Sequence, residues 1–234
     1  MIDKLVRYVR KRAQWARCAR ALRDVHSVTE FHRFLQRTRM LAPYVTDAPE
    51  VSQQKRAAIA ATLSAYDVQV TGRRVLDIGP GYGDFLDVCR ERGALTVGLD
   101  HDPLVVRWLQ LRGHIALRGN VLRSLKSLHA QPFDLINSTG SIIVEYFSLV
   151  GMGRLRRLLA RFEEHLAPGG RILICPYFEH GPGRVRKIRD PLNCPFTDTL
   201  CSAGYTVLPR IEGVHDDHMY ALTYGKQRPP ANAT

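Results

Sequence analysis

The sequence predicts an α/β fold built on a doubly wound, mostly parallel sheet. From residue 73 onward, apolar strand-like runs alternate with helical stretches through short links, which is typical of parallel sheets with right-handed crossovers. The first strand-like run leads directly into a glycine-rich turn and a helix start, with the sequence V-L-D-I-G-P-G-Y-G-D over residues 75–84. Open α/β sheets bind nucleotides at the carboxyl ends of their strands, so this turn marks the candidate site.

The order of the expected elements follows from the spacing of apolar residues, glycines and prolines. Strands are expected at 73–78, 95–99, 114–117, 133–137 and 171–175, and helices near 84–91, 103–111, 121–128, 145–166 and 196–203. Pro168-Gly169-Gly170 is expected to end a helix and turn into the fifth strand. The last two strand-like runs, 205–211 and 219–224, are joined by a link too short for a crossover, which predicts an antiparallel hairpin.

A basic helical appendage is expected at residues 1–68, ahead of the α/β domain at 69–226 and a loose tail at 227–234. Its helices are expected at 2–24, 28–41 and 49–66. Residues 1–40 contain eleven Lys/Arg and three Asp/Glu, so +8 of the net charge of +12 lies there. Such a surface suits RNA, an anionic membrane or an acidic substrate. The apolar face of the first helix changes side midway, whereas a membrane-surface helix keeps one apolar face.

The composition narrows the class of protein. The hydrophobic and charged fractions, 45% and 24% of 234 residues, are those of a globular domain. The five cysteines are odd in number and form no C-x-x-C, which favours reduced thiols and no metal site. No apolar run is long enough to span a bilayer, and no signal peptide is evident. We therefore expect a cytoplasmic protein, whose basic N-terminus would allow it to attach to the inner face of a membrane.

The spacing of the glycine turn distinguishes between nucleotides. It is G-x-G-x-G with an acid two residues ahead, whereas a dinucleotide fold has G-x-G-x-x-G and a P-loop has a Lys after its glycines. Asp77 at the end of a buried strand would be costly without a partner, which argues for a functional turn. Asp100 ends the second strand, where it would bind ribose hydroxyls or cap the helix that Pro103 begins. Asn120 after the third strand would contact a purine edge or cap a helix, and the sequence leaves both open.

This ordered set resembles the class I S-adenosylmethionine-dependent methyltransferases. The resemblance is carried by D-I-G-P-G-Y-G at 77–83, G-L-D at 98–100, F-D-L-I at 133–136, L-A-P-G-G-R-I-L-I at 166–174 and the closing hairpin. It covers residues 73–224. It implies a Rossmann-like sheet of seven strands, in which the last strand lies antiparallel between the fifth and the sixth, and S-adenosyl-L-methionine as the cofactor.

The resemblance also implies which residues hold the methionine and sugar portions of the cofactor. The backbone of the glycine turn would lie alongside these portions, at Gly79, Gly81, Tyr82 and Gly83. Asp77 would help to hold the amino acid part.

Five further cofactor positions follow from the same resemblance. Asp100 would take the ribose hydroxyls, and His101 would lie near the adenine face. Asn120 and the backbone of Val121 would contact the adenine. Asn137 would border the methionine end and the transferred methyl group.

The methyl acceptor is indicated only by loops. Methyltransferases that act on adenine or glutamine amide nitrogens share an N/D-P-P-Y/F motif after the fourth strand, but this chain has N-S-T-G at 137–140. His180 after the fifth strand and His215 after the sixth are candidate general bases, although both also fit solvated polar loops. We therefore expect transfer to oxygen of a small molecule or glycan. The alternatives are an RNA methyltransferase that uses the basic N-terminal helices, and a non-catalytic cofactor-binding module that docks on an anionic surface.

Overall fold

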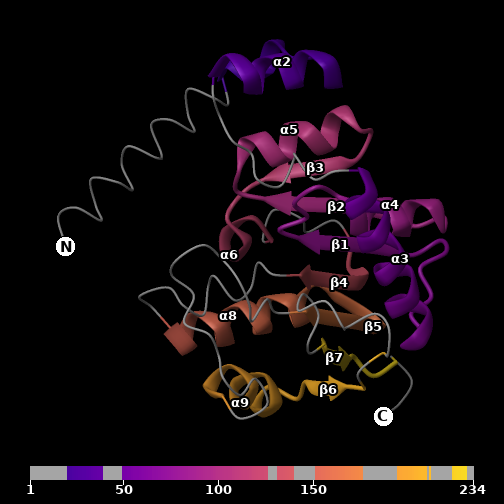
Figure 1. Cartoon of the computed structure of the whole chain (residues 1–234). Coiled ribbons are helices and arrows are strands. Elements are labelled where there is room, and N and C mark those ends of the chain that lie inside the picture. The colour runs from indigo at the N-terminus through magenta and orange to yellow at the C-terminus, as the bar shows by residue number, and fades with distance from the viewer. Residues whose placement is uncertain are drawn as a thin grey trace.

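The computed structural model describes residues 20–38, 49–125, 131–139, 151–175, 194–209, 211 and 223–230. Within these residues a seven-stranded sheet has the order β3-β2-β1-β4-β5-β7-β6, with helices on both faces (Figure 1). This confirms the predicted fold class, including the antiparallel last strand.

Five parallel strands stand next to one another in the sheet, starting from the β3 edge. They are β1 (Arg74–Ile78), β2 (Leu95–Asp100), β3 (Ile115–Arg118), β4 (Phe133–Thr139) and β5 (Leu166–Cys175). The strand β7 (Thr223–Gln227) pairs antiparallel with both β5 and β6 (Thr206–Leu208), so the last strand of the chain lies inside the sheet. The predicted strands at 205–211 and 219–224 correspond to β6 and β7, although residues 212–222 lie outside the described part.

The helices follow the predicted order. They are α2 (Val28–Thr38), α3 (Pro49–Ala65), α4 (Asp84–Glu91), α5 (Pro103–Leu111), α6 (Val121–Ser124), α8 (Gly151–Glu164) and α9 (Pro195–Ser202), with a short 3-10 turn η1 (Leu22–Asp24) before α2. The bounds of α4 and α5 agree with the predicted 84–91 and 103–111. Most of the predicted helix at 2–24 lies outside the described residues.

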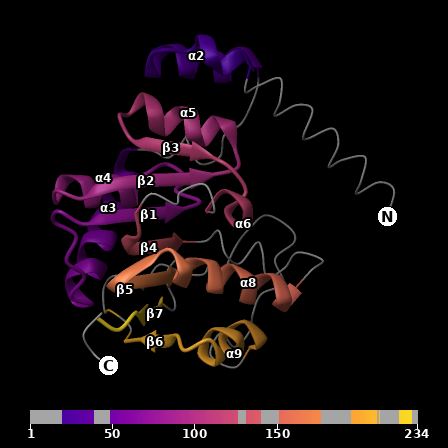
Figure 2. The same ribbon diagram turned by 180° about the vertical axis from the view of Figure 1, so that it is seen from behind.

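Two layers of helices cover the sheet, as the opposite views of Figures 1 and 2 show. Residues that alternate along each strand belong to different cores: Leu76 and Ile172 pack with Phe162 of α8, whereas Val75 and Leu173 pack on the α3–α4 side. Buried parallel strands need apolar residues on both faces, which explains their nearly continuous hydrophobic sequences.

The segment Pro168-Gly169-Gly170 differs from the prediction of a helix stop and turn. The helix α8 already ends at Glu164, and β5 begins at Leu166, which pairs with Phe133 before the register shifts. Gly169 has φ +74°, and its N–H donates to the carbonyl oxygens of Arg228 and Pro229 at 3.1 and 3.3 Å. The segment is therefore the irregular first part of a strand, stabilised by residues that follow β7.

The N-terminal elements pack on the α/β unit in two regions, one on α5 and one on α4. Leu22 of η1 and Phe31 and Phe34 of α2 share a core with Trp108 of α5. The helix α3 contacts α4, where Ser52 Oγ donates to Asp84 Oδ1 at 2.5 Å. In the part of the chain that the structure describes, no helix is both long and apolar enough to cross a membrane.

Candidate functional site

The glycine turn between β1 and α4 has a backbone that only glycine adopts without strain at three positions. Gly79, Gly81 and Gly83 have φ values of +69°, +53° and +96°. A Cβ at Gly83 would lie 2.5 Å from Leu109 Cδ2, so this position also lacks space for a side chain. The turn can therefore bring its backbone close to a ligand beyond the strand end.

The carbonyl oxygen of Tyr82 holds this turn to α5. It accepts hydrogen bonds from Trp108 Nε1 at 3.0 Å and from Arg112 Nη1 at 2.5 Å. The Arg112 guanidinium carbon lies 4.9 Å from the centre of the Tyr82 ring, in cation–π geometry. Two donors, one from α5 and one from the residue that follows it, thus fix the peptide group between Tyr82 and Gly83.

Arg112 is itself anchored by the buried carboxylate of Asp87, which has an exposed side-chain fraction of 3%. His114 Nε2 lies 3.0 Å from Asp87 Oδ1. Burial acts to raise the pKa of Asp87, but the hydrogen bond from His114 and the charge of Arg112 outweigh it and hold the pKa below its usual range. The sequence did not reveal this cluster, since its only signals were an acid in the first turn of α4 and a basic pair after α5.

Asp77 lies at the centre of the site. It is 2% exposed, and its Oδ1 accepts a hydrogen bond of 2.8 Å from Nδ2 of Asn137, its register partner on β4. Burial raises the pKa of Asp77 to about 7; the bond from Asn137 opposes this, and the charge of Asp100 adds to it. A buried carboxyl in this state is suited to a cationic ligand group, because a positive charge would favour its ionised form.

Asp100 ends β2, the strand beside β1. Its Oδ1 accepts the N–H of Asp102 at 2.8 Å and lies 3.2 Å from His101 Nδ1. The alternative that Asp100 caps α5 is wrong, because Asp102 caps it by accepting the N–H of Leu104 at 2.9 Å. Asp100 therefore keeps carboxylate capacity for a ligand at the strand end.

Asn120 follows β3 and caps α6, which begins at Val121. Its Oδ1 accepts the N–H of Leu122 at 3.1 Å, so the capping interpretation holds. The N–H of the preceding Gly119 donates to the Asp100 carbonyl at 2.8 Å, which places the two strand ends side by side. The amide nitrogen of this exposed Asn120 remains available to a purine edge.

The polar residues predicted from the sequence thus lie along one edge of the sheet. The strands β3, β2, β1 and β4 are adjacent and parallel, and their carboxyl ends carry, in this order, Asn120, Asp100, Asp77 with the glycine turn, and Asn137. Carboxylates for an ammonium and for ribose hydroxyls, an amide for adenine and a glycine turn between them form a donor set that fits S-adenosylmethionine.

The structure describes fewer of the residues that were predicted to contact the methyl acceptor. His180 and His215, the predicted candidates for a base, both lie outside the described residues. Cys175 at the end of β5 is 4% exposed, and burial raises its pKa to about 11, so it is a packed thiol. Among the described residues, no group of three or more His, Cys, Asp or Glu side chains could hold a metal ion.

Comparison with known families identifies the class. A family model described as "Methyltransferase domain" matches residues 50–194, more than half of the chain, so the chain belongs to this family. The protein is an S-adenosylmethionine-dependent methyltransferase. A search of the curated proteins finds no match.

Solved structures share the fold at low identity. The SAM-bound amino pentose methyltransferase CalS10 of Micromonospora echinaspora is 16% identical, with a TM-score of 0.54 over 80% of this chain and 94% of its own. The N-methyltransferase NodS of Bradyrhizobium japonicum, in complex with S-adenosyl-L-homocysteine, is 18% identical, with a TM-score of 0.53 over 79% and 90%. An O-methyltransferase family protein of Burkholderia thailandensis is 16% identical, with a TM-score of 0.53 over 77% of this chain and 57% of its own.

Proposed function

We propose that this methyltransferase transfers the methyl group to a hydroxyl of a small molecule or glycan. The observation that carries the proposal is the sequence after Asn137, where Ser138-Thr139-Gly140 stands in place of the N/D-P-P-Y/F motif of amide and adenine methylation. The named neighbours support a small acceptor, since they include an amino pentose methyltransferase and an O-methyltransferase family protein.

The cofactor is proposed to lie along the edge from Asn120 to Asn137. Asp77 would face the ammonium of the methionine part, and Asp100 would accept from the ribose hydroxyls. The amide of Asn120, the backbone of Val121 and the exposed ring of His101 would border the adenine. This order brings the sulfonium and its methyl group next to Asn137, where the acceptor would approach.

Isothermal titration with S-adenosylhomocysteine tests these cofactor roles. Asp100→Ala should weaken binding by about 100-fold, since two hydrogen bonds to a charged group are lost. The matched control is Asp102→Ala, which removes the cap of α5 and should cost about 1 kcal/mol of stability while leaving affinity nearly unchanged. Equal affinities of the two variants would contradict the ribose role of Asp100.

The chemistry of an oxygen acceptor requires a base, because a hydroxyl is a weak nucleophile until its proton is removed, whereas a neutral amine needs none. His180 and His215 are proposed for this role. Replacing the acting histidine by alanine should lower kcat by about 10²–10⁴-fold and leave S-adenosylhomocysteine affinity unchanged. Full activity of both variants toward the acceptor would remove the case for transfer to oxygen.

The +8 charge of residues 1–40 favours RNA as a second acceptor class. An RNA methyltransferase would bind RNA with an affinity that falls steeply as salt rises, because released counterions drive the binding. Binding that barely changes with salt would exclude this candidate.

A further inference from the structure

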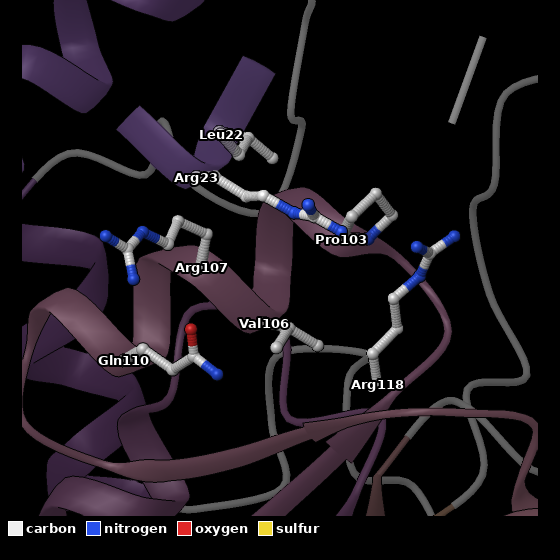
Figure 3. Close-up of a pocket in the computed structure, with 7 residues that line it drawn as sticks. All are labelled: Leu22, Arg23, Pro103, Val106, Arg107, Gln110 and Arg118. Carbon is white, nitrogen blue, oxygen red and sulfur yellow. The ribbon is translucent and has the colours of Figure 1, made fainter. Parts of the chain in front are cut away.

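A small cavity lies where η1, one face of α5 and the end of β3 meet (Figure 3). Its volume is about 260 Å³, just below the roughly 300–1,000 Å³ of sites for drug-sized ligands. Three arginines from three different elements line it: Arg23 of η1, Arg107 of α5 and Arg118 of β3. Among the described residues, no carboxylate lines this cavity.

Two of these arginines bring a positive charge that no described residue neutralises. The guanidinium groups of Arg23 and Arg118 form no ion pair or hydrogen bond within the described ranges, whereas Arg56, Arg90 and Arg112 all contact the carboxylate of Asp87. Figure 3 shows the side chains of Arg23 and Arg118 ending on either side of Pro103 at the start of α5. Their charges therefore converge on one hollow rather than spreading over the surface.

The third arginine is held in a defined position. Arg107 Nε donates to the carbonyl oxygen of Val25 at 2.8 Å, and its Nη2 donates to the same oxygen. A carbonyl is uncharged, so the bond orients the guanidinium without neutralising it. Its remaining N–H groups lie at the opposite end of the cavity from Arg118 (Figure 3).

Apart from Gln110, whose Nε2 donates to the carbonyl oxygen of Ala116 at 3.0 Å, the rest of the wall is apolar. Leu22 and Val106 are buried, with exposed fractions of 3% and 7%, and Pro103 is buried beside them. These apolar atoms lower the local dielectric constant on the inner side of the hollow, while the exposed Arg23 and Arg118 border its open side.

From this geometry we propose that the cavity binds a phosphate group. Guanidinium groups match phosphate oxygens with paired N–H donors, and the two convergent charges of Arg23 and Arg118 suit a dianionic phosphomonoester, with Arg107 adding a third positive charge at the far end of the cavity. The described residues 20–38, which include η1 and α2 and carry four arginines and two acids, would help to attract such an anion. Arg118 is the register partner of Asp100, so the cavity adjoins the proposed cofactor-binding edge, but it shares no residue with that edge. We therefore expect the phosphate to bind beside the cofactor and not in its place. The inference does not depend on the methyl acceptor.

Both a small phosphorylated molecule and an anionic lipid headgroup carry this group, and the test separates them. Calorimetry with inorganic phosphate and with glycerol phosphate is compared with sedimentation on phosphatidylcholine vesicles that contain or lack phosphatidic acid. The proteins are the wild type, Arg23→Gln, Arg118→Gln and the double variant. The matched control is Arg156→Gln, which removes one exposed charge on α8, across the sheet from the cavity.

We expect saturable binding by the wild type, weakened about tenfold by each cavity substitution and unchanged in Arg156→Gln. S-adenosylhomocysteine affinity should be the same in all proteins, which also shows that each is folded. Loss of phosphate or glycerol phosphate binding in the double variant supports a small ligand, and loss confined to vesicles supports a lipid headgroup. Equal binding by the double variant and wild type, an equal loss in Arg156→Gln, or no saturable binding of any probe would overturn the site.

Discussion

Replacing Asp77 by asparagine should stabilise the cofactor-free protein while weakening its hold on the cofactor. The side chain is 2% exposed, so its charged form loses most of its hydration on folding. Asparagine has nearly the same size, and its amide oxygen can still accept the 2.8 Å bond from Asn137. The substitution therefore removes a buried charge without opening a cavity.

The magnitude follows from the pKa of Asp77, which folding raises from 3.8 to about 7, mainly through burial. Because the pKa is higher in the folded state, the stabilising contribution of protonated Asp77 is fully present below pH about 4 and is lost as the pH rises through 7. Each pKa unit corresponds to about 1.4 kcal/mol, so this residue should lower the free energy of unfolding by up to about 4 kcal/mol across that window. Asp77→Asn should not show this loss.

Urea unfolding of cofactor-free protein at several pH values measures the effect. The stability advantage of Asp77→Asn should be about 1–2 kcal/mol near pH 5 and should grow toward about 4 kcal/mol above pH 7. Asp198→Asn, the same change at an exposed position of α9, should show little difference and no such trend. An advantage that stays constant with pH, or a variant less stable than wild type at about pH 8, would refute the reasoning.

The remaining predictions concern the glycine turn and its support. Gly83→Ala should lower the free energy of unfolding by about 2–4 kcal/mol, because alanine is strained at this positive φ and its Cβ would clash with Leu109. Gly72→Ala is the control: it also lies at a positive φ, +69°, but with open space around its Cβ, so it should cost only about 1–2 kcal/mol. Equal losses of stability in thermal or urea unfolding would contradict the contribution of the clash. Arg112→Met should weaken S-adenosylhomocysteine binding by about tenfold or more, because it removes one of the two donors that hold the Tyr82 carbonyl and leaves only Trp108. Arg90→Met also removes an ion pair with Asp87 but does not touch the turn, so calorimetry should find its affinity near that of wild type. Similar affinities of the two methionine variants would show that the turn keeps its shape without Arg112.

Local sequence signals were sufficient for the elements around the site. Gly83 and Pro103 mark the starts of α4 and α5, and Gly93 and Gly113, both with positive φ, follow their ends. Since strand ends in a parallel sheet meet at one edge, Asp77, Asp100 and Asn120 could be expected to lie near one another, and the resemblance to class I methyltransferases added their roles toward the cofactor.

Contacts between distant segments explain what the sequence did not reveal. Arg112 lies 30 residues from Tyr82 and 25 from Asp87, and no local pattern indicates which carbonyl or carboxylate it contacts. The inclusion of Pro168–Gly170 in β5 depends on pairing with β4 and on Arg228, whose N–H donates to the Gly170 carbonyl at 2.9 Å. A glycine pair after a proline indicates a turn when only its neighbours in the chain are considered.

The position of β7 has a consequence for synthesis of the protein. This strand, formed after β6 in the chain, separates β5 from β6 and places the fully buried Tyr224 in the core, with its hydroxyl 2.5 Å from Thr197 Oγ1. Until residues 223–227 leave the ribosome, β5 has an unpaired edge and β6 has no strand beside it, which is the state in which nascent chains aggregate. Chains that stop before Thr223 should therefore depend on chaperones or be degraded, although every residue of the proposed cofactor-binding edge has already been made.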